Sequence, residues 1–456
     1  MRTLISLCVA GGLLSAFGLG LWPDFSNATL PPNIAPLNFR VTGTGPAAVT
    51  LRDADGGELR PEMDATGVAR WREGDWRAFL SRNAGRPVFF DVACGSDRRI
   101  VTNRVATEMI DARLVYRLVP PGYTGFSLLR ICRRDLTSFA EETLVRNVER
   151  SYHRCLNCHV PNRADPEEYV CSFRAVDAGT RIVSRRYGDR FLRLEGLPGW
   201  PGTVAYPAWH PSGDFIAFAV SETRQAFPAD GRDFVEVVDL SSNVMLYSLS
   251  DGRKVAVEGG TDALETCPEW SPDGRTLYTV RTTDPLGGVA GAARMEKMRR
   301  VLGEVRYDLV ARDFDVTNRT FSAPRTLYCA SAERKSAAWP RASADGRWLV
   351  LTLADHGYFH VWHGDADLYL FDLRTGAVRA LDEINSPAAE SYHSFSHDGR
   401  WLVFSSRRDD GAYTRPYFAR FDPDAGRFDP PFPLPLASPD DYFRRMESYN
   451  VPEFER

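Results

Sequence analysis

Lysine is scarce in this chain. Only three of its 456 residues are lysines, so arginine carries almost all of the positive charge, and the formal net charge is −4. Proteins that bind nucleic acid usually present a basic surface to the phosphates, so this balance argues against a nucleic-acid partner. A GC-rich genome explains the preference for arginine without any phosphate-binding role.

Long apolar segments are also scarce. A single uncharged run, residues 4–21, precedes a break at Trp22-Pro23. It has the shape of an export signal, although Ala16-Phe17-Gly18 is a poor cleavage site. It is also about long enough to span a membrane, so residues 1–23 are either a cleaved signal peptide or an N-terminal anchor. Either alternative predicts a periplasmic or cell-envelope location.

No G-x-S-x-G nucleophile elbow occurs, which disfavours an α/β-type hydrolase. Hydrophobic residues make up 43% of the chain and charged residues 25%, as in ordinary globular proteins. This length predicts two or three domains, each able to bury a core. No catalytic residue is predicted, and whether the protein is an enzyme stays open.

The most specific motif is Cys155-Leu156-Asn157-Cys158-His159. CxxCH is the attachment signature of c-type haem, in which two thiols bind the porphyrin and the adjacent imidazole binds the iron. We therefore predict one covalently attached haem c, held by Cys155 and Cys158, with His159 as the proximal iron ligand. A zinc site and a CxxC redox pair are the alternatives, although adjacent Cys158 and His159 suit one tetrahedral zinc poorly.

The sixth ligand of the haem iron would decide the function. A six-coordinate haem transfers electrons, whereas an open site binds or activates small molecules. No Met or His lies between residues 160 and 209. Distal candidates from elsewhere all have more ordinary structural explanations: His153, Met109, Met245, Met295, Met298, Cys171 and Tyr169.

Three further histidines, His356, His360 and His363, lie in one short segment. In a strand, His356 and His360 would share a face. Three acidic residues nearby make a metal site conceivable: Asp355, Asp365 and Asp367. The more ordinary explanation is a loop whose histidines bond to the backbone. Turn or blade packing explains the remaining histidines: His210, His393 and His397.

Five cysteines lie outside the apolar run and the haem motif. In an oxidising compartment, Cys94 with Cys132 and Cys267 with Cys329 are plausible disulfides, which leaves Cys171 over. Sequence alone does not determine the connectivity.

Short alternating segments at 37–41, 48–51, 87–92 and 114–118 predict a β-sandwich-like domain over 24–134, with a helical insertion near 74–84. The period then changes. Apolar residues recur at helical spacing over 135–153, after Asp135 as N-cap: Leu136, Phe139, Leu144, Val145 and Val148. We predict a helix there, leading into a short haem segment over 135–180.

From 181 to 440 the chain repeats an aromatic–turn–strand pattern, as in Trp270-Ser271-Pro272-Asp273-Gly274. Each unit holds two hairpins, and repeats of this kind are typical of β-propeller blades. Four blades are recognisable from the repeat. The hairpin at 181–194 and the ends of the chain could complete a propeller of five or six blades. Residues 441–456 are predicted to be a C-terminal tail.

The repeat resembles the TolB-like β-propeller, whose blades carry W-S-P-D-G. Several other segments, taken with CxxCH, resemble a family of exported bacterial proteins that join a CxxCH segment to such a propeller: 33–39, 209–213, 362–370, 414–417 and 448–454. The resemblance implies haem, export and a propeller, and it supplies no established reaction. Relatives carry Met and His soon after the haem motif, and this chain has neither there.

The predicted function is periplasmic electron transfer by a monohaem cytochrome whose propeller acts as scaffold or docking surface. A redox protein or an envelope protein would be the partner. The alternatives are a propeller binding module with haem-based redox or gas sensing, and a haem-dependent oxidoreductase.

Overall fold

The computed structural model describes residues 19–121, 128–147, 155–174, 179–193, 202–226, 235–257 and 262–456. These residues form two compact units. The first comprises the described residues up to Ile110 with Leu136–Phe139 and Pro430–Arg445, and the second contains the rest.

The first unit contains two sheets. One has the strand order β1 (Gly20–Trp22), β3 (Phe39–Thr42), β7 (Val68–Arg70), β6 (Glu62–Met63). The other has the order β2 (Thr29–Leu30), β9 (Asp97–Val105), β8 (Pro87–Cys94), β4 (Ala47–Asp53), β5 (Glu58–Leu59). Phe39 of β3 packs against Phe90 of β8 with ring centroids 6.1 Å apart, and α1 (Glu73–Arg82) adds Trp76 to the same core. The predicted sandwich and its helical insertion are confirmed. Residues 430–445 add β34 (Phe432–Pro433) and α3 (Asp441–Arg444).

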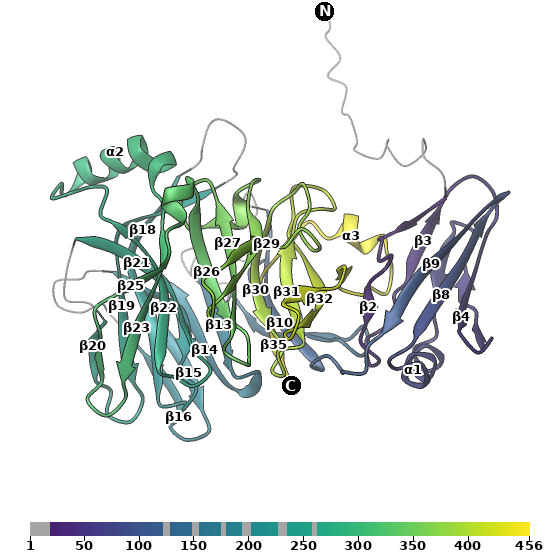
Figure 1. The fold of residues 1–456 in the computed structure, drawn as a ribbon, viewed down its shortest axis with the longest axis horizontal. Helices are drawn as coiled ribbons and strands as arrows, with labels where there is room; N and C mark the ends of the chain where they lie inside the picture. The colour runs from purple at the N-terminus through teal and green to yellow at the C-terminus, as the bar shows by residue number, and fades with distance from the viewer. Residues whose placement is uncertain are drawn as a thin grey trace, which may run out of the picture. The chain divides into compact units, whose positions relative to one another are not determined.

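The second unit is a series of antiparallel sheets, which we number as blades (Figure 1). Blade 1 holds β13 (Cys155–Asn162), β14 (Asp165–Arg174), β15 (Gly179–Ser184) and β16 (Gly188–Leu192). Blade 2 holds β17 (Thr203–Trp209), β18 (Phe215–Ala226), β19 (Glu236–Ser248) and β20 (Lys254–Ala256). Blade 3 holds β21 (Ala263–Trp270), β22 (Thr276–Thr283), β23 (Asp308–Asp315), β24 (Thr320–Phe321) and β25 (Arg325–Tyr328).

Blade 4 holds β26 (Ser336–Ala342), β27 (Trp348–Ala354), β28 (Asp367–Asp372) and β29 (Val378–Ala380). Blade 5 holds β30 (Glu390–Phe395), β31 (Trp401–Ser406), β32 (Arg415–Asp422) and β33 (Arg427–Phe428). Blade 6 holds β35 (Ser448–Glu455), β10 (Arg113–Val119), β11 (Arg130–Asp135) and β12 (Glu141–Arg146). Short helices lie between strands: α2 (Ala292–Val301), η3 (Leu302–Glu304), η4 (Ala330–Glu333) and η5 (His360–Trp362).

The blades close into a ring. The first strand of each blade contacts the first strand of the next, and β35 contacts both β30 and β13. Blade 6 combines the last strand of the chain with three strands that precede blade 1, as Figure 1 shows for β35 and β10. Within the described residues the ring therefore has six blades. The mainly β fold and the propeller are confirmed.

The repeated Asp-Gly segments form tight turns between the first two strands of a blade. In blade 3, Ser271 Oγ donates to Asp273, whose carboxylate accepts from the backbone N–H of Arg275, and Gly274 has φ 72°. Blades 4 and 5 repeat this arrangement around Asp345 and Asp398. Such hairpins need a residue at positive φ, which glycine adopts without strain.

A second repeat was not visible in the sequence. The first strand of every blade carries a bulge, and the bulged residue has positive φ in five of them: Tyr206, Cys267, Trp339, Tyr392 and Val451. A bulge of this kind bends a strand and re-aims its side chains. The register of β13 shifts between Asn157 and His159, so Cys158 holds the equivalent place in blade 1.

The predicted helix over 135–153 is wrong for its described part. Residues 141–146 form strand β12, with alternating half-buried and exposed side chains, and residues 148–154 lie outside the described residues. Over a few residues the apolar pattern of this segment fits both a helical period and a strand period. The pairing of β12 with β11 in blade 6 makes it a strand.

Several predicted boundaries also change. The predicted strand at 114–118 belongs to blade 6 rather than to the sandwich, because β10 pairs with β35. The propeller begins before residue 181, since the predicted haem segment supplies blade 1, and the predicted tail contains β35. At the N-terminus β1 pairs with β3, so a cleaved signal that reached residue 23 would remove a strand of the first unit.

The proposed disulfides do not form. None of Cys94, Cys132, Cys171, Cys267 and Cys329 is disulfide-bonded. Cys94 and Cys132 belong to different units, and burial of Cys267 raises the pKa of its thiol to about 12. A thiol held protonated in this way is unreactive.

Candidate functional site

The CxxCH segment lies on β13, the strand of blade 1 that faces its neighbours around the ring. Cys158 occupies the bulge, and His159 follows it. In four other blades a proline follows the bulge: Pro207, Pro268, Pro340 and Pro452. Blade 5 instead has His393 after Tyr392. The last two residues of CxxCH therefore coincide with a position of the blade repeat.

His159 is enclosed between blades 1 and 6. Its side chain is 5% exposed, and it hydrogen-bonds with the backbone of Val115 on β10 and Val451 on β35. Burial, helped by the charge of Arg117, lowers the pKa of the imidazole to about 4, so the ring is neutral at pH 7. Its Nε2 has no hydrogen-bond partner. The side chains of Cys155 and Cys158 lie outside the described residues.

His393 is the counterpart of His159 in blade 5. Its Nε2 lies 3.0 Å from the carbonyl oxygen of Val350, on the second strand of the preceding blade. Val350 is paired with Arg341 in blade 4, and Val115 is paired with Glu453 in blade 6. Arg341 and Glu453 each lie two residues after the bulge of their blade. His393 and His159 therefore contact equivalent backbone carbonyls of the preceding blade. An imidazole at this position can therefore serve packing between blades without any haem.

The chemistry of His159 fits an axial haem ligand, because iron binds a neutral imidazole through an unprotonated nitrogen. The backbone sets a condition. Residues 155–158 are extended, which places the Cα atoms of Cys155 and Cys158 about 10 Å apart. Two thioether bonds to one porphyrin need a tight CxxC turn. Haem attachment would therefore require residues 155–158 to break their pairing with β14.

One of the described distal candidates, Cys171, is a neighbour of His159. Cys171 pairs directly with His159, so its side chain lies beside the imidazole on the same face of the sheet. Met109 is 68% exposed in the first unit, and Met245 and Met298 are buried in the propeller. Tyr169 is half-buried, and burial raises its pKa. His153 lies outside the described residues.

We predict that His393 makes the stability of the propeller sensitive to acid. Burial, reinforced by the Arg341 charge, lowers its pKa from 6.5 to about 3, although the bond to Val350 opposes this. As the pH falls below 6.5, the unfolded chain takes up a proton that the folded chain excludes, so stability falls with it. We expect the free energy of unfolding to drop by about 3 kcal/mol between about pH 7 and pH 4 from this residue alone.

Urea denaturation of the wild type and of His393→Gln at both pH values measures this effect. Glutamine can still donate to the Val350 carbonyl but does not titrate in this range. The variant should lose that part of the pH dependence. An identical pH dependence in the two proteins would show that His393 is not responsible.

The other histidines considered in the sequence lie in different environments in the structure. His210 bonds Ser212 Oγ at 2.8 Å and the Gly274 carbonyl at 3.0 Å, and His397 pairs with Asp111, so both pack in turns as predicted. His360 bonds the carbonyl oxygen of Gly357 at 3.1 Å.

His356 and His363 instead converge on Glu236, at the start of β19. No local sequence pattern marks Glu236 as a partner of these histidines, because it lies 127 residues before His363. The cluster contains none of the predicted acidic partners Asp355, Asp365 and Asp367. Asp355 and Asp365 pair with Lys335 at 2.8 and 3.9 Å instead.

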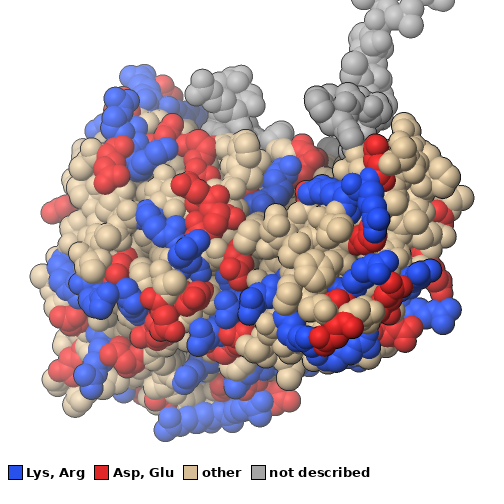
Figure 2. Space-filling view, turned by 45° about the vertical axis from the view of Figure 1, so that its right-hand side comes forward, with Lys and Arg blue, Asp and Glu red and all other residues tan. Residues whose placement is uncertain are grey.

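Charges of both signs are intermixed over the face drawn in Figure 2. This agrees with the small net charge of the chain. None of the helices in the described part of the chain is long and apolar enough to cross a membrane.

Comparisons with known proteins give similarity of fold alone. No protein-family model matches the chain, and no curated protein matches it. TolB from Acinetobacter baumannii is 15% identical, with a TM-score of 0.47 over 81% of this chain and 79% of TolB. A puromycin-hydrolysing peptidase from Mycobacterium tuberculosis is 15% identical, with a TM-score of 0.40 over 93% of this chain and 57% of the peptidase. At these identities no function transfers from either protein.

Proposed function

We propose that this chain is an exported monohaem c-type protein built on a six-bladed propeller, and that it transfers electrons in the periplasm or cell envelope. One observation carries the proposal. The CxxCH motif ends in His159, whose imidazole is neutral, buried and without a hydrogen-bond partner at Nε2. Cys155 and Cys158 would hold the porphyrin, and His159 would bind the iron.

When bound, the haem would supply one-electron chemistry. The chain's own residues would fix and enclose it. Val451 of β35 forms part of the wall around His159, and β35 is the strand that closes the ring. Haem attachment would therefore have to precede closure of blade 6, while residues 155–158 can still form a turn. Redox encounters need little interface, so a propeller face suffices for docking a redox or envelope protein.

A second candidate rests on the equivalence of His159 and His393. If CxxCH is only part of the blade repeat, the chain is a propeller binding module without haem. The two functions differ in one measurable property, which is the presence of covalent haem.

The test is expression of the full chain with a cytochrome c maturation system, followed by the pyridine haemochrome spectrum and the intact mass. We expect one thioether-linked haem per chain, and none in Cys155→Ala/Cys158→Ala. His159→Gln should lose the low-spin spectrum, whereas the matched variant His393→Gln should keep it. A haem-free wild type after successful maturation of a control cytochrome would overturn the proposal and leave the binding module.

The reduced protein is then exposed to carbon monoxide. An unchanged spectrum indicates a filled sixth position and supports electron transfer. Immediate binding indicates an open position and favours gas sensing or a haem-dependent oxidoreductase.

A further inference from the structure

A second site lies on the propeller, apart from the CxxCH strand. Glu236 begins β19 in blade 2, and His356 and His363 lie in the segment between β27 and β28 in blade 4. One ligand atom from each of the three lies within 4.8 Å of the others. Glu236 Oε2 is 2.5 Å from His363 Nε2 and 3.7 Å from His356 Nε2.

Burial makes this cluster unusual. The side chains of Glu236 and His363 are fully buried, whereas that of His356 is 22% exposed. Glu236 Oε1 is buried and has no hydrogen-bond partner. An ionised carboxylate away from water is costly unless a positive charge and hydrogen bonds compensate it.

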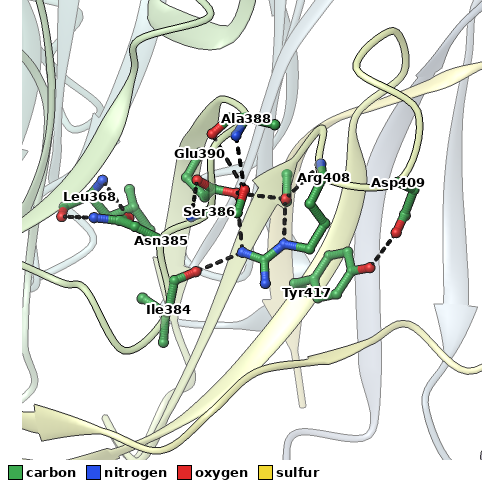
Figure 3. A network of polar contacts seen from close by, with 10 residues as sticks. Leu368, Ile384, Asn385, Ser386, Ala388, Glu390, Arg408, Asp409 and Tyr417 are labelled. Carbon is green, nitrogen blue, oxygen red and sulfur yellow. Dashed lines mark hydrogen bonds and ion pairs between the residues drawn. The ribbon is translucent and has the colours of Figure 1, made fainter. Parts of the chain in front are cut away.

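Another buried carboxylate in the same propeller shows how such compensation is arranged. Glu390 accepts hydrogen bonds from the Ser386 backbone at 2.9 Å, from the hydroxyls of Ser386 and Ser406 at 2.7 and 2.8 Å, and from Arg408 at 3.1 Å (Figure 3). Glu236 has no arginine or lysine among its ion-pair partners within the described residues. Its two ion-pair partners there are imidazoles, which are metal-binding groups.

The segment that carries the histidines is anchored independently of them. Tyr358 donates a hydrogen bond to Asp239 Oδ1 at 2.8 Å, which joins the segment to β19 three residues beyond Glu236. The Tyr358 ring also packs against Tyr206 and Tyr307, at centroid distances of 6.1 and 5.6 Å. At Gly357 (φ 68°) an added Cβ would lie 3.0 Å from Glu236 Oε1, so glycine permits the close approach. The ligand groups are therefore held together by the fold.

We propose that Glu236, His356 and His363 bind a divalent transition metal, and that zinc is the ion this donor set favours. Two imidazoles and one carboxylate form a known set of three protein ligands for zinc, with ligand distances of about 2.0–2.2 Å. The present separations need shifts of about 1 Å to reach that geometry. Three protein ligands would leave a coordination position for water or a small ligand. The site is independent of the proposed haem.

Metal content tests the proposal on the full chain. The protein is stripped with a chelator and dialysed, zinc is added back, and the bound zinc and its affinity are measured by elemental analysis and calorimetry. We expect one zinc per chain. His356→Ala, at the partly exposed ligand, and the isosteric Glu236→Gln should each weaken binding by at least about tenfold.

Two control variants separate this site from other binding. His397→Ala removes a histidine that also pairs with a buried carboxylate, Asp111, and should leave zinc binding unchanged. Cys155→Ala/Cys158→Ala should also leave it unchanged, and a cobalt-substituted protein should show no thiolate-to-cobalt charge-transfer band. The proposal would be overturned if the wild type bound no zinc, or if His356→Ala and Glu236→Gln bound zinc as tightly as the wild type. It would also be overturned if Cys155→Ala/Cys158→Ala lost zinc binding.

Discussion

Removing residues 448–456 is expected to abolish the folded propeller. These residues contain β35, which supplies the first strand of blade 6 and contacts blades 5 and 1. Its loss would expose the edge of β10 and remove Tyr449 and Phe454, which are 2% and 1% exposed. Domain stability is typically about 5–15 kcal/mol, less than the loss of a whole core strand would take away. We expect no cooperative thermal transition of the propeller and strong aggregation.

Circular dichroism, thermal unfolding and size-exclusion chromatography measure this effect. A chain that lacks only Arg456 keeps all of β35 and should behave as the wild type. A synthetic peptide covering 446–456 should restore part of the transition, because an open sheet edge pairs with an added strand. A truncated chain that still unfolds cooperatively at the wild-type temperature would contradict the closure of the ring through β35.

Arg341→Ala is expected to destabilise the propeller by about 3 kcal/mol or more, because it leaves two carboxylates without their cation. Arg341 lies two residues after the bulge of blade 4, and Glu269 and Glu453 hold the same place in blades 3 and 6. The guanidinium donates to Glu269 at 3.0 Å and to Glu453 at 3.1 Å. The exposed fractions of the three side chains are 12%, 19% and 10% respectively.

The effect should depend on pH. Burial raises the pKa of Glu453 from 4.5 to about 7, although Arg341 opposes the rise. Without Arg341 the folded-state pKa rises further, so the folded chain binds a proton that the unfolded chain releases above 4.5. Between about pH 4.5 and 7 the stability of both proteins should therefore fall with this group, and that of Arg341→Ala should keep falling above pH 7. Its deficit should be smallest in acid and should grow above about pH 7.

Arg181→Ala is the matched control, because Arg181 makes two hydrogen bonds to Asp189 on the surface of blade 1. Its loss should cost less than about 1 kcal/mol. Replacing Glu269 and Glu453 by glutamine in the Arg341→Met background should recover much of the lost stability. Equal effects of Arg341→Ala and Arg181→Ala in urea denaturation would contradict the buried network.

The repeats of the chain could be read before folding, and the assembly of blade 6 could not. The Asp-Gly turns depend on local chemistry, since a tight hairpin needs a residue at positive φ, and they predict the blades correctly. By contrast, β12 satisfies a helical and a strand period over six residues. Only its pairing with β11, and that of β10 with β35, placed these strands in the propeller.

The same division applies to the candidate sites. CxxCH is a contiguous motif, so the haem prediction needs no fold. The equivalence of His159 with His393 appears only when the bulges are compared, because it depends on the carbonyl that each ring meets in the preceding blade. Glu236 had no local signal at all, since nothing near it in the sequence indicates that it faces His363.

The sequence by itself therefore determined the blade repeat, the tight turns and the CxxCH motif, because each depends on residues within a few positions of one another. The tertiary structure decided which strand closes the ring, which histidines pack between blades and which ones meet Glu236. These outcomes depend on pairings between distant segments, and distant segments carry no periodicity that records which partner they will meet.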